Sequence, residues 1–512
     1  MTWISNAVMV AVTGLQERGG MVSQRRILVD AQKGKGEFTI EGIGGVAARD
    51  LVNRYDNAFG CTNIKGGNPL CSHQLITSAP PSEELITPSL DMAMLAAFYR
   101  ATLCAPGDVS PPDGIYGGEV CSDGTFLPLR NPLAAGLEAK RAGQPIYCAP
   151  ESAKICALAG AEAIPIGNMN ELYKLVFYCG LVVPDRAEAM ELPDEQGEAI
   201  DMAHIRGQDR AKRVLEIAAA GGHNVLLVGE PGCGKSLLAK AMAGILPPMA
   251  RDEQIEISSL HMAAGLTDGL LTSRPVRLID PTATRAALLG GGSETVFPGE
   301  VTLATGGILF IDEILQAPKA MVESLRGPLQ DGFVTISRVG WRVRFPARPT
   351  LVAAANPCPC GFAGSDACIC TPAQRKKYAS KLSGPLVDRV DLRLTMSAIS
   401  GADLLRAGNA ETSDVIRGRV TAARRRQEKR YAGTGVNCNA DLDADMIPGI
   451  VPPAGPALDA LLDAAEREKL SSRGVHRTLK TARTVADLAG RDEITVEDVE
   501  EVIGYLDVDL HA

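Results

Sequence analysis

The sequence predicts an α/β protein with a parallel-sheet domain, followed by a helical region and preceded by a smaller α+β domain. Three observations support this. The motif GEPGCGKS at 229–236 lies between a strand-like run and a helix-like run. A second apolar run, GILFI, ends in two carboxylates. From about residue 413 onward the apolar residues follow helical spacing.

Composition favours a multidomain protein of the cytoplasm. A chain of 512 residues can bury more than one core, which predicts two to four domains. We find no run of about 18 apolar residues and no N-terminal signal-peptide pattern, so we expect no membrane partner. The 13 cysteines then predict thiols or metal ligands rather than disulfides. The net charge of −9 requires any nucleic-acid surface to be local.

The chain divides into four segments. Residues 1–180 mix short apolar runs with turn residues, which predicts an α+β domain with short strands. Residues 181–201 form an acidic linker, with seven acidic residues against one arginine between Asp185 and Asp201. Residues 202–395 are the α/β domain, and residues 396–512 are the helical lid.

Within the last two segments the strongest patterns place individual elements. We expect strands at NVLLV from 224, at GILFI from 307 and at TLVAAA from 350. We expect helices at 470–490 and from 496, with Thr495 as the N-cap of the second.

The loop at 229–236 matches G-x-x-x-x-G-K-[ST] in the required setting between strand and helix. Its glycines let backbone N–H groups point at phosphate oxygens, and the following helix adds its positive dipole end. Lys235 would reach the terminal phosphates of ATP, and Ser236 would ligate Mg²⁺. The predicted nucleotide-binding residues are Gly229, Glu230, Pro231, Gly232, Cys233, Gly234, Lys235 and Ser236.

Asp312 and Glu313 end the GILFI strand. Asp312 would hold Mg²⁺, directly or through water, and Glu313 would polarise the attacking water. A strand that simply runs into solvent is the alternative, but the position after a phosphate loop argues against it.

Five stretches then resemble the magnesium-chelatase-like AAA+ proteins, and most closely their ComM (YifB) group. They are RGQDRAKRVLEIAAAGGHNVLLVGEPGCGKS, LLGGGSETVFPGEVTLATGGILFIDE, FPARPTLVAAANPCPCG, CTPAQRKKYASKLSGPLVDRVD and LSSRGVHRTLKTARTVADLAG. The resemblance implies an AAA+ P-loop NTPase core with a helical lid, and a homo-oligomeric ring that takes the family's usual hexameric form.

The resemblance also implies roles for three further residues. Asn356 corresponds to the sensor of the water or γ-phosphate, Arg389 to an arginine finger for the neighbouring subunit's ATP, and Arg473 to a lid arginine that reads nucleotide state. A guanidinium suits the charge that develops on a transferred phosphoryl group. A structural salt bridge is the alternative for each arginine.

The chain departs from the family in one place. The usual histidine pair before the GGG motif is replaced by Asp280 and Pro281. Any contact that those histidines make with DNA or a neighbouring subunit is therefore in doubt here.

Cys358, Cys360, Cys368 and Cys370 form two C-x-C pairs with a Gly-containing connector between them. Four thiolates suit tetrahedral Zn²⁺, although this spacing is less common than C-x-x-C. A chance cluster or a redox pair is the alternative. The cluster also resembles the cysteine-bearing version of the family, in which a structural zinc beside the ATP site is implied.

Residues 1–180 resemble, more weakly, the Lon-protease-like domain of ComM relatives. Ser89 lies near the position of a dyad serine, but Arg130 stands where the dyad lysine is expected, and arginine cannot serve as a base near neutral pH. We therefore expect a non-proteolytic domain for assembly or substrate contact.

Basic residues concentrate at 417–430 and again in QRKK from 374. The first group comprises Arg417, Arg419, Arg424, Arg425, Arg426, Lys429 and Arg430. Such a stretch can attract a phosphate backbone without reading its sequence. A solvated lid helix or an intersubunit surface is the alternative.

These features leave three functions. The first is a ComM-like helicase ring that hydrolyses ATP to drive branch migration of branched or single-stranded DNA during natural transformation. The second is a magnesium-chelatase-type motor subunit, against which the N-terminal domain counts. The third is a nucleotide-dependent remodelling scaffold, against which Lys235, Glu313 and Arg389 count.

Overall fold

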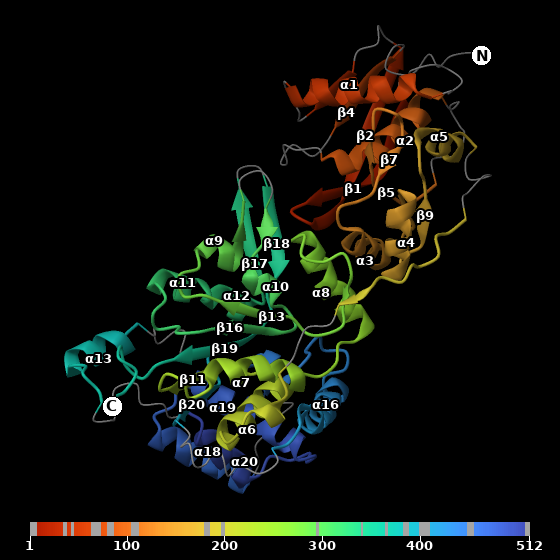
Figure 1. Cartoon of the computed structure of the whole chain (residues 1–512). Coiled ribbons are helices and arrows are strands. Elements are labelled where there is room, and N and C mark those ends of the chain that lie inside the picture. The colour runs from red at the N-terminus through yellow and green to blue at the C-terminus, as the bar shows by residue number, and fades with distance from the viewer. Residues whose placement is uncertain are drawn as a thin grey trace.

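The computed structural model describes most of the chain. The residues described are 8–33, 38–41, 46–62, 73–78, 87–103, 112–178, 185–195, 200–292, 296–338, 341–363, 367–381, 389–398, 410–447 and 455–506. The N-terminal domain, the α/β domain and the helical lid follow one another along the molecule (Figure 1). None of the helices in these ranges combines the length and apolar character needed to cross a bilayer.

The α/β domain is built on a five-stranded parallel sheet in the order β13-β16-β19-β11-β20. Its strands are β13 (Val276–Ile279), β16 (Ile308–Ile311), β19 (Thr350–Ala355), β11 (Val225–Gly229) and β20 (Leu392–Met396). The three predicted strands are confirmed within one residue, as β11, β16 and β19. β11 and β16 are buried throughout, as expected of strands covered on both faces.

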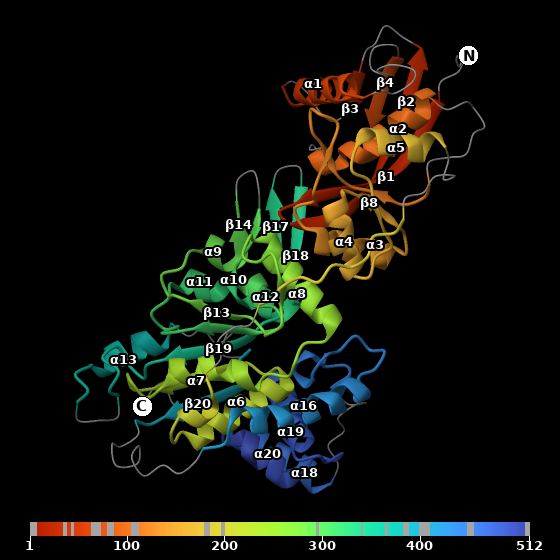
Figure 2. The ribbon, with the colours of Figure 1, turned by 45° about the vertical axis from the view of Figure 1, so that its right-hand side comes forward.

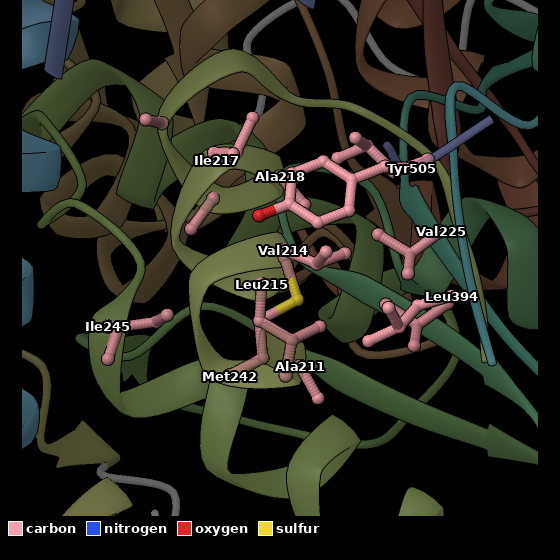
Figure 3. Close-up of a cluster of buried hydrophobic side chains, with 14 of the residues drawn as sticks. Ala211, Val214, Leu215, Ile217, Ala218, Val225, Met242, Ile245, Leu394 and Tyr505 are labelled. Carbon is pink, nitrogen blue, oxygen red and sulfur yellow. The ribbon is translucent and has the colours of Figure 1, made fainter. Parts of the chain in front are cut away.

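Helices cover this sheet and join it to the lid. Helix α6 (Asp209–Gly221) lies over it, with Val214 and Ala218 facing Val225 and Leu394 (Figure 3). Tyr505, from the end of the lid, enters the same cluster. Burial of one aliphatic side chain such as Val214 or Leu394 stabilises the fold by about 1.5–3 kcal/mol. The shared core explains why the lid packs closely on the α/β domain.

The lid contains four helices of eight or more residues in the described ranges. They are α16 (Ser413–Arg430), α18 (Pro456–Arg467), α19 (Ser472–Leu488) and α20 (Val496–Ile503). The predicted start of α20 at Val496 is confirmed, and α19 begins two residues after the predicted position. The Asp498 carboxylate accepts the Thr495 N–H at 2.8 Å, and the Ser471 hydroxyl accepts the Gly474 N–H at 3.2 Å.

The N-terminal domain contains a seven-stranded mixed sheet in the order β3-β4-β2-β1-β5-β8-β9. Its strands are β1 (Val8–Arg18), β2 (Met21–Lys33), β3 (Phe38–Glu41), β4 (His73–Ser78), β5 (Ile115–Tyr116), β8 (Ile146–Cys148) and β9 (Ala163–Pro165). Helices α1 (Val46–Gly60), α2 (Asp91–Leu103), α3 (Pro132–Ala142), α4 (Pro150–Leu158) and α5 (Met169–Phe177) complete it.

The expectation of short strands is wrong for β1 and β2, which span 11 and 13 residues. Gly14 interrupts the apolar alternation of β1. Its role is close packing, because a Cβ there would lie 2.6 Å from Leu90 Cδ2 and 2.9 Å from Ala93 Cβ. Gly14 therefore lets helix α2 pack directly on the strand.

The N-terminal and α/β domains are in contact through α3 and α8 (Arg251–Ala263). Leu133 and Ile255 share a buried cluster there. The Asn131 amide donates to the carbonyls of Gly20 at 2.7 Å and Ser259 at 2.9 Å. The domains are thus joined by buried apolar and polar contacts.

The acidic segment takes part in this arrangement. Residues 194–195 form β10 (Asp194–Glu195), which pairs in parallel with β12 (Leu270–Leu271). Residues 181–184 and 196–199 of the proposed linker lie outside the described ranges.

A β-hairpin projects from the α/β domain toward the N-terminal domain (Figure 2). It consists of β17 (Phe333–Arg338) and β18 (Trp341–Pro346). Val343 and Phe345 are buried in a cluster that Met21 of the N-terminal domain also contacts. Arg342 and Arg344 point to the opposite face and are exposed, as the alternation of a strand requires.

Candidate nucleotide-binding site

The phosphate loop connects β11 to α7 (Lys235–Ala241) at the carboxyl edge of the sheet. Gly232 and Gly234 have φ values of 81° and 94°, and a Cβ at either would meet nothing within 4 Å. These glycines are needed for backbone conformation rather than for space. The loop can therefore turn its N–H groups toward a phosphate at the start of α7.

Lys235 is the centre of the site, with only 7% of its surface exposed. Its Nζ donates to the carbonyls of Gly229 at 2.7 Å and Glu230 at 3.0 Å, and to Asn356 Oδ1 at 3.2 Å. A buried ammonium needs such acceptors to offset its desolvation. A nucleotide phosphate could take over some of these contacts with stronger charge.

Ser236 and Asp312 are brought together as the sequence predicts. The Ser236 hydroxyl donates to Asp312 Oδ2 at 2.7 Å, and Asp312 Oδ1 accepts the Glu313 N–H at 2.9 Å. A hydroxyl and a carboxylate oxygen suit the oxygen-rich coordination of Mg²⁺. The pair fits a magnesium ion bound beside the loop.

Glu313 and Asn356 complete this cluster from adjacent strands, β16 and β19. Asn356 Nδ2 lies 3.4 Å from Glu313 Oε1, while Asn356 Oδ1 faces Lys235. Glu313 has a φ of 47°, the left-handed region that residues other than glycine adopt at a cost. One amide therefore links the loop lysine to the carboxylate predicted to polarise water.

Arg389 lies at the other edge of the sheet. It precedes β20, whose first residue Leu392 pairs with Val225 at the start of β11, whereas the loop begins at the far end of that strand. The Arg389 guanidinium hydrogen-bonds the Gln330 side chain. The structure does not bring Arg389 to the phosphate loop of its own chain.

Arg473 lies in the first turn of α19 and is exposed. Within the described ranges it makes no hydrogen bond or ion pair with the loop residues, so its predicted role is not reflected in a direct contact.

The sequence analysis gave no role to Gln208, which also belongs to this site. Its Nε2 donates to the carbonyls of Cys233 in the loop at 3.2 Å and Ser397 at 2.8 Å. It adopts a φ of 59° just before α6. The only sequence signal was its place in the stretch RGQDRA, because its partners lie 25 and 189 residues away.

The four cysteines predicted to form a cluster are close together. Their ligand atoms all lie within 4.8 Å of one another, and Cys358 Sγ lies 3.3 Å from Cys360 Sγ and 3.9 Å from Cys368 Sγ. Bonds of about 2.3 Å to a tetrahedral zinc ion place sulfur atoms about 3.8 Å apart. The group could hold a metal ion of this kind.

The cysteine loop touches the phosphate loop. Gly361 has a φ of 89°, and a Cβ there would lie 2.6 Å from Pro231 Cδ. After the cluster, α13 (Pro372–Ala379) begins at Thr371, whose hydroxyl accepts the Gln374 N–H at 3.3 Å. The cysteine loop therefore lies directly against the phosphate loop.

The basic stretch forms most of α16, and acidic residues neutralise much of its charge. Arg419 pairs with Glu216 at 2.5 Å and Glu411 at 2.8 Å, and Arg430 pairs with Asp487 at 2.5 Å. Arg417 and Arg426 pair with Asp414 and Asp492, and Arg424 donates to the Ala219 carbonyl. These contacts favour the lid-helix alternative. The QRKK stretch lies on the exposed side of α13, apart from half-buried Arg375.

In the N-terminal domain, Ser89 and Arg130 both adjoin Glu17. The Ser89 hydroxyl accepts the Glu17 N–H at 3.0 Å and hydrogen-bonds Thr87 at 2.8 Å. The Arg130 N–H donates to Glu17 Oε2 at 3.3 Å. No lysine contacts the Ser89 hydroxyl in the residues that the structure describes.

Asp280 and Pro281, which replace the expected histidines, follow β13. Asp280 Oδ1 accepts the Thr282 N–H at 2.7 Å and its hydroxyl at 2.5 Å, and these bonds lower the pKa of Asp280. The pair forms a local turn here.

Comparisons with known proteins agree with this architecture. The family model described as magnesium chelatase, subunit ChlI matches residues 201–404, and the model of its C-terminal region matches residues 410–506. An uncharacterised protein of Mycobacterium tuberculosis is 33% identical over 98% of both chains. YifB of Salmonella typhimurium is 34% identical over 77% of both, and competence protein ComM of Haemophilus influenzae is 38% identical over 60% of both.

Proposed function

Because the chain belongs to the magnesium-chelatase-like family of AAA+ proteins, with YifB and ComM among its relatives, we propose that it is an ATP-hydrolysing ring motor. The observation that carries the proposal is the single hydrogen-bonded cluster of Lys235, Asn356 and Glu313 beside the Ser236–Asp312 pair.

In this proposal each residue has one task. The loop N–H groups and Lys235 bind the β- and γ-phosphates, and Ser236 and Asp312 hold Mg²⁺, which neutralises charge on the phosphates. Glu313 orients the attacking water and accepts its proton, and Asn356 keeps that carboxylate beside the γ-phosphate.

The opposite positions of Arg389 and the phosphate loop support hydrolysis in trans. An arginine at the amino edge of the sheet can serve a neighbour's ATP when subunits stack side by side. A closed ring gives every site such a neighbour. We propose a ring of six subunits, the family's usual form, in which Arg473 reports the nucleotide state of its own subunit.

We further propose that the ring acts on branched or single-stranded DNA, as a ComM-like helicase in branch migration during natural transformation. Similarity to a protein named as a competence protein supports this substrate. Because acidic residues pair with much of the positive charge on α16, we place the proposed DNA surface on the β17–β18 hairpin instead. Exposed Arg342 and Arg344 lie on one of its faces, and Arg344 stacks 3.3 Å from the Phe333 ring centroid.

The test measures ATPase activity and strand displacement on a branched DNA by purified protein, with Glu313→Gln as the inactive control. We expect DNA to stimulate the ATPase of the wild type. We expect Arg342→Ala/Arg344→Ala to lose stimulation and displacement but keep the basal rate, and Arg425→Ala/Lys429→Ala to keep all three. Basal ATPase without stimulation or displacement would reject the DNA proposal alone.

The chelatase-type motor remains the second candidate, because both matching family models are described as magnesium chelatase. It predicts ATPase activity that responds to a protein partner and not to DNA. The packing of the N-terminal domain onto α8 weighs against it, because that domain adds a surface which the chelatase motor does not require.

For the cysteine cluster we propose a structural zinc ion held by Cys358, Cys360, Cys368 and Cys370. Protein purified without chelator should contain about one equivalent of zinc. Cys368→Ser/Cys370→Ser should lose it, whereas Cys148→Ser, at a buried cysteine elsewhere, should not. Less than about half an equivalent in the wild type would reject the site.

A further inference from the structure

A chain of buried polar groups links the lid to the segment that bears Arg389. His223, between α6 and β11, is fully buried. Its Nε2 lies 2.8 Å from Thr484 Oγ1 on α19, and its Nδ1 lies 3.6 Å from Asp391 Oδ2. One imidazole thus contacts a lid helix on one side and the start of β20 on the other.

The segment 389–391 is fixed largely by its contacts with Asn224 and α19. The Asn224 N–H donates to Asp391 Oδ2 at 3.0 Å, and Asn224 Nδ2 donates to the Arg389 carbonyl at 2.9 Å. Arg477 of α19 donates to the Val390 carbonyl at 2.6 Å. The backbone position of Arg389 therefore depends on both β11 and α19.

The lid side of the chain is equally well defined. The Thr484 hydroxyl donates to the Lys480 carbonyl at 3.1 Å and accepts from Asn439 Nδ2 at 2.9 Å. The direction of the bond between Thr484 Oγ1 and His223 Nε2 depends on the imidazole tautomer, and the hydroxyl can serve either tautomer. Gly221 packs closely against both partners, because a Cβ on it would lie 2.2 Å from His223 Nε2 and 2.5 Å from Thr484 Oγ1.

One helix carries both ends of this connection. Arg473, Arg477 and Thr484 all lie on α19, a continuous helix of 17 residues. A movement of Arg473 toward a bound nucleotide would move Arg477 and Thr484 with it. Arg477 donates directly to the Val390 carbonyl, and Thr484 bonds His223, whose Nδ1 lies 3.6 Å from Asp391 Oδ2.

We infer that His223 and Thr484 are positioning residues that couple α19 to the Arg389–Asp391 segment. Through them, nucleotide binding in one subunit sets the position of its Arg389 relative to the ATP of the next subunit. The inference rests on the proposed ATPase function. A purely apolar core at this place would hold the lid equally well without linking these two segments.

The test compares two isosteric changes on α19. Thr484→Val removes the hydroxyl that His223 contacts. Thr481→Val is the matched control, because Thr481 is equally buried and its hydroxyl donates only to the Arg477 carbonyl at 2.9 Å within its own helix. We expect Thr484→Val to lower kcat about tenfold with little change in ATP affinity, since misplacing a catalytic group acts on the transition state. We expect Thr481→Val to stay within about twofold of the wild type, since it leaves the link to Arg389 intact.

Mixing separates positioning from structural damage. A Glu313→Gln subunit keeps the loop that binds nucleotide and an intact connection to Arg389 but lacks the carboxylate proposed to orient water, so it should restore ATPase activity to a Thr484→Val subunit beside it. Equal kcat in the two valine variants, or no recovery on mixing, would overturn the inference.

A second readout does not depend on hydrolysis. Hydrogen exchange at residues 389–398 is followed with and without a non-hydrolysable ATP analogue. We expect the analogue to change exchange there in the wild type and Thr481→Val, and not in Thr484→Val. A wild type that binds the analogue but lacks ATPase activity would reject the proposed function, while the exchange result would still decide the inference. The same response in all three proteins would overturn it.

Discussion

At the scale of the residue, Glu313 shows how the site is prepared for a ligand. Its left-handed φ of 47° turns its side chain out of the strand direction beside Asn356. Such a conformation costs of order 1–3 kcal/mol and persists where the surroundings enforce it. Here the Glu313 N–H is held by Asp312, and the Glu313 carbonyl accepts the Gln316 N–H at 2.7 Å. The strained backbone conformation therefore occurs at the residue that we propose to orient the attacking water.

Asp91 in the N-terminal domain gives a prediction about pH. It is fully buried and accepts hydrogen bonds from Arg54 at 3.0 Å, Tyr55 at 2.9 Å and the Val120 N–H at 3.1 Å. Burial raises the pKa of Asp91 from 3.8 to about 7, although Arg54, Val120 and Tyr55 act in the opposite direction. Between these two pKa values the folded state holds a proton that the unfolded state has released.

The protonated Asp91 carboxyl therefore contributes fully to the free energy of unfolding below its pKa in the unfolded chain. This contribution is lost as pH rises through the pKa of Asp91 in the folded protein. We expect the melting temperature of the N-terminal domain to fall from about pH 4 to about pH 7. Asp91→Asn should show a weaker decline in the same thermal melts. A difference between the two proteins that does not vary with pH would contradict this assignment.

Sequence reasoning worked for residues whose positions follow from strand topology. Glu313 and Asn356 each follow an apolar strand, and parallel strands end at one edge, so their proximity could be anticipated. Gln208 could not be anticipated, because its partners Cys233 and Ser397 are set by how α6 and β20 meet in space. A local sequence pattern does not indicate a contact between segments so far apart in the chain.

At the scale of the element, the cysteine loop is the part most closely tied to the nucleotide site. Gly361→Ala would force an alanine into a left-handed conformation, which costs about 1–2 kcal/mol, and would press its Cβ against Pro231. We expect the KM for ATP to rise several-fold while zinc content stays unchanged. ATPase kinetics together with metal analysis would measure both.

The matched control is Gly433→Ala, at a φ of 81° with nothing within 4 Å of the added Cβ. It imposes similar backbone strain away from Pro231 and should leave the KM unaltered. If both alanine variants, or neither of them, raise the KM, the contact between Gly361 and Pro231 does not position the loop.

Helix α16 shows why a run of basic residues does not by itself identify a binding surface. Its run of arginines is evident in the sequence, but the partners of Arg419, Arg426 and Arg430 include Glu216, Asp492 and Asp487, which lie 57 to 203 residues away. Folding brings these charges together. The exposed arginines of the β17–β18 hairpin were less conspicuous in the sequence, because apolar residues alternate with them.

At the scale of the whole molecule, the residues that we propose for the nucleotide site lie at two opposite edges of one sheet. Lys235, Ser236, Asp312, Glu313 and Asn356 gather at the carboxyl edge, whereas Arg389 lies before β20 at the amino edge. The order of the sheet fixes this separation, since β11 and β20 are parallel neighbours. With Arg389 as the finger that we propose, a complete site would require a second subunit.

The N-terminal domain adds to this assembly without contributing to the phosphate loop. It packs on α8 through Leu133 and Asn131, and Met21 contacts the cluster beneath the β17–β18 hairpin. These contacts place the domain next to the hairpin that we propose to meet DNA. Its arrangement suits substrate contact more than catalysis.

The measurement that tests the central claim most directly is the ATPase rate of a mixture of two inactive variants. Glu313→Gln keeps the loop and Arg389 but lacks the carboxylate proposed to orient water, whereas Arg389→Ala lacks the finger but keeps the loop and Glu313. Each alone should hydrolyse ATP at least about a hundredfold more slowly than the wild type. Mixed, they should recover a substantial fraction of its rate, because the first supplies Arg389 to the loop of the second. No recovery in mixed rings, or full activity of Arg389→Ala alone, would contradict a site shared between subunits.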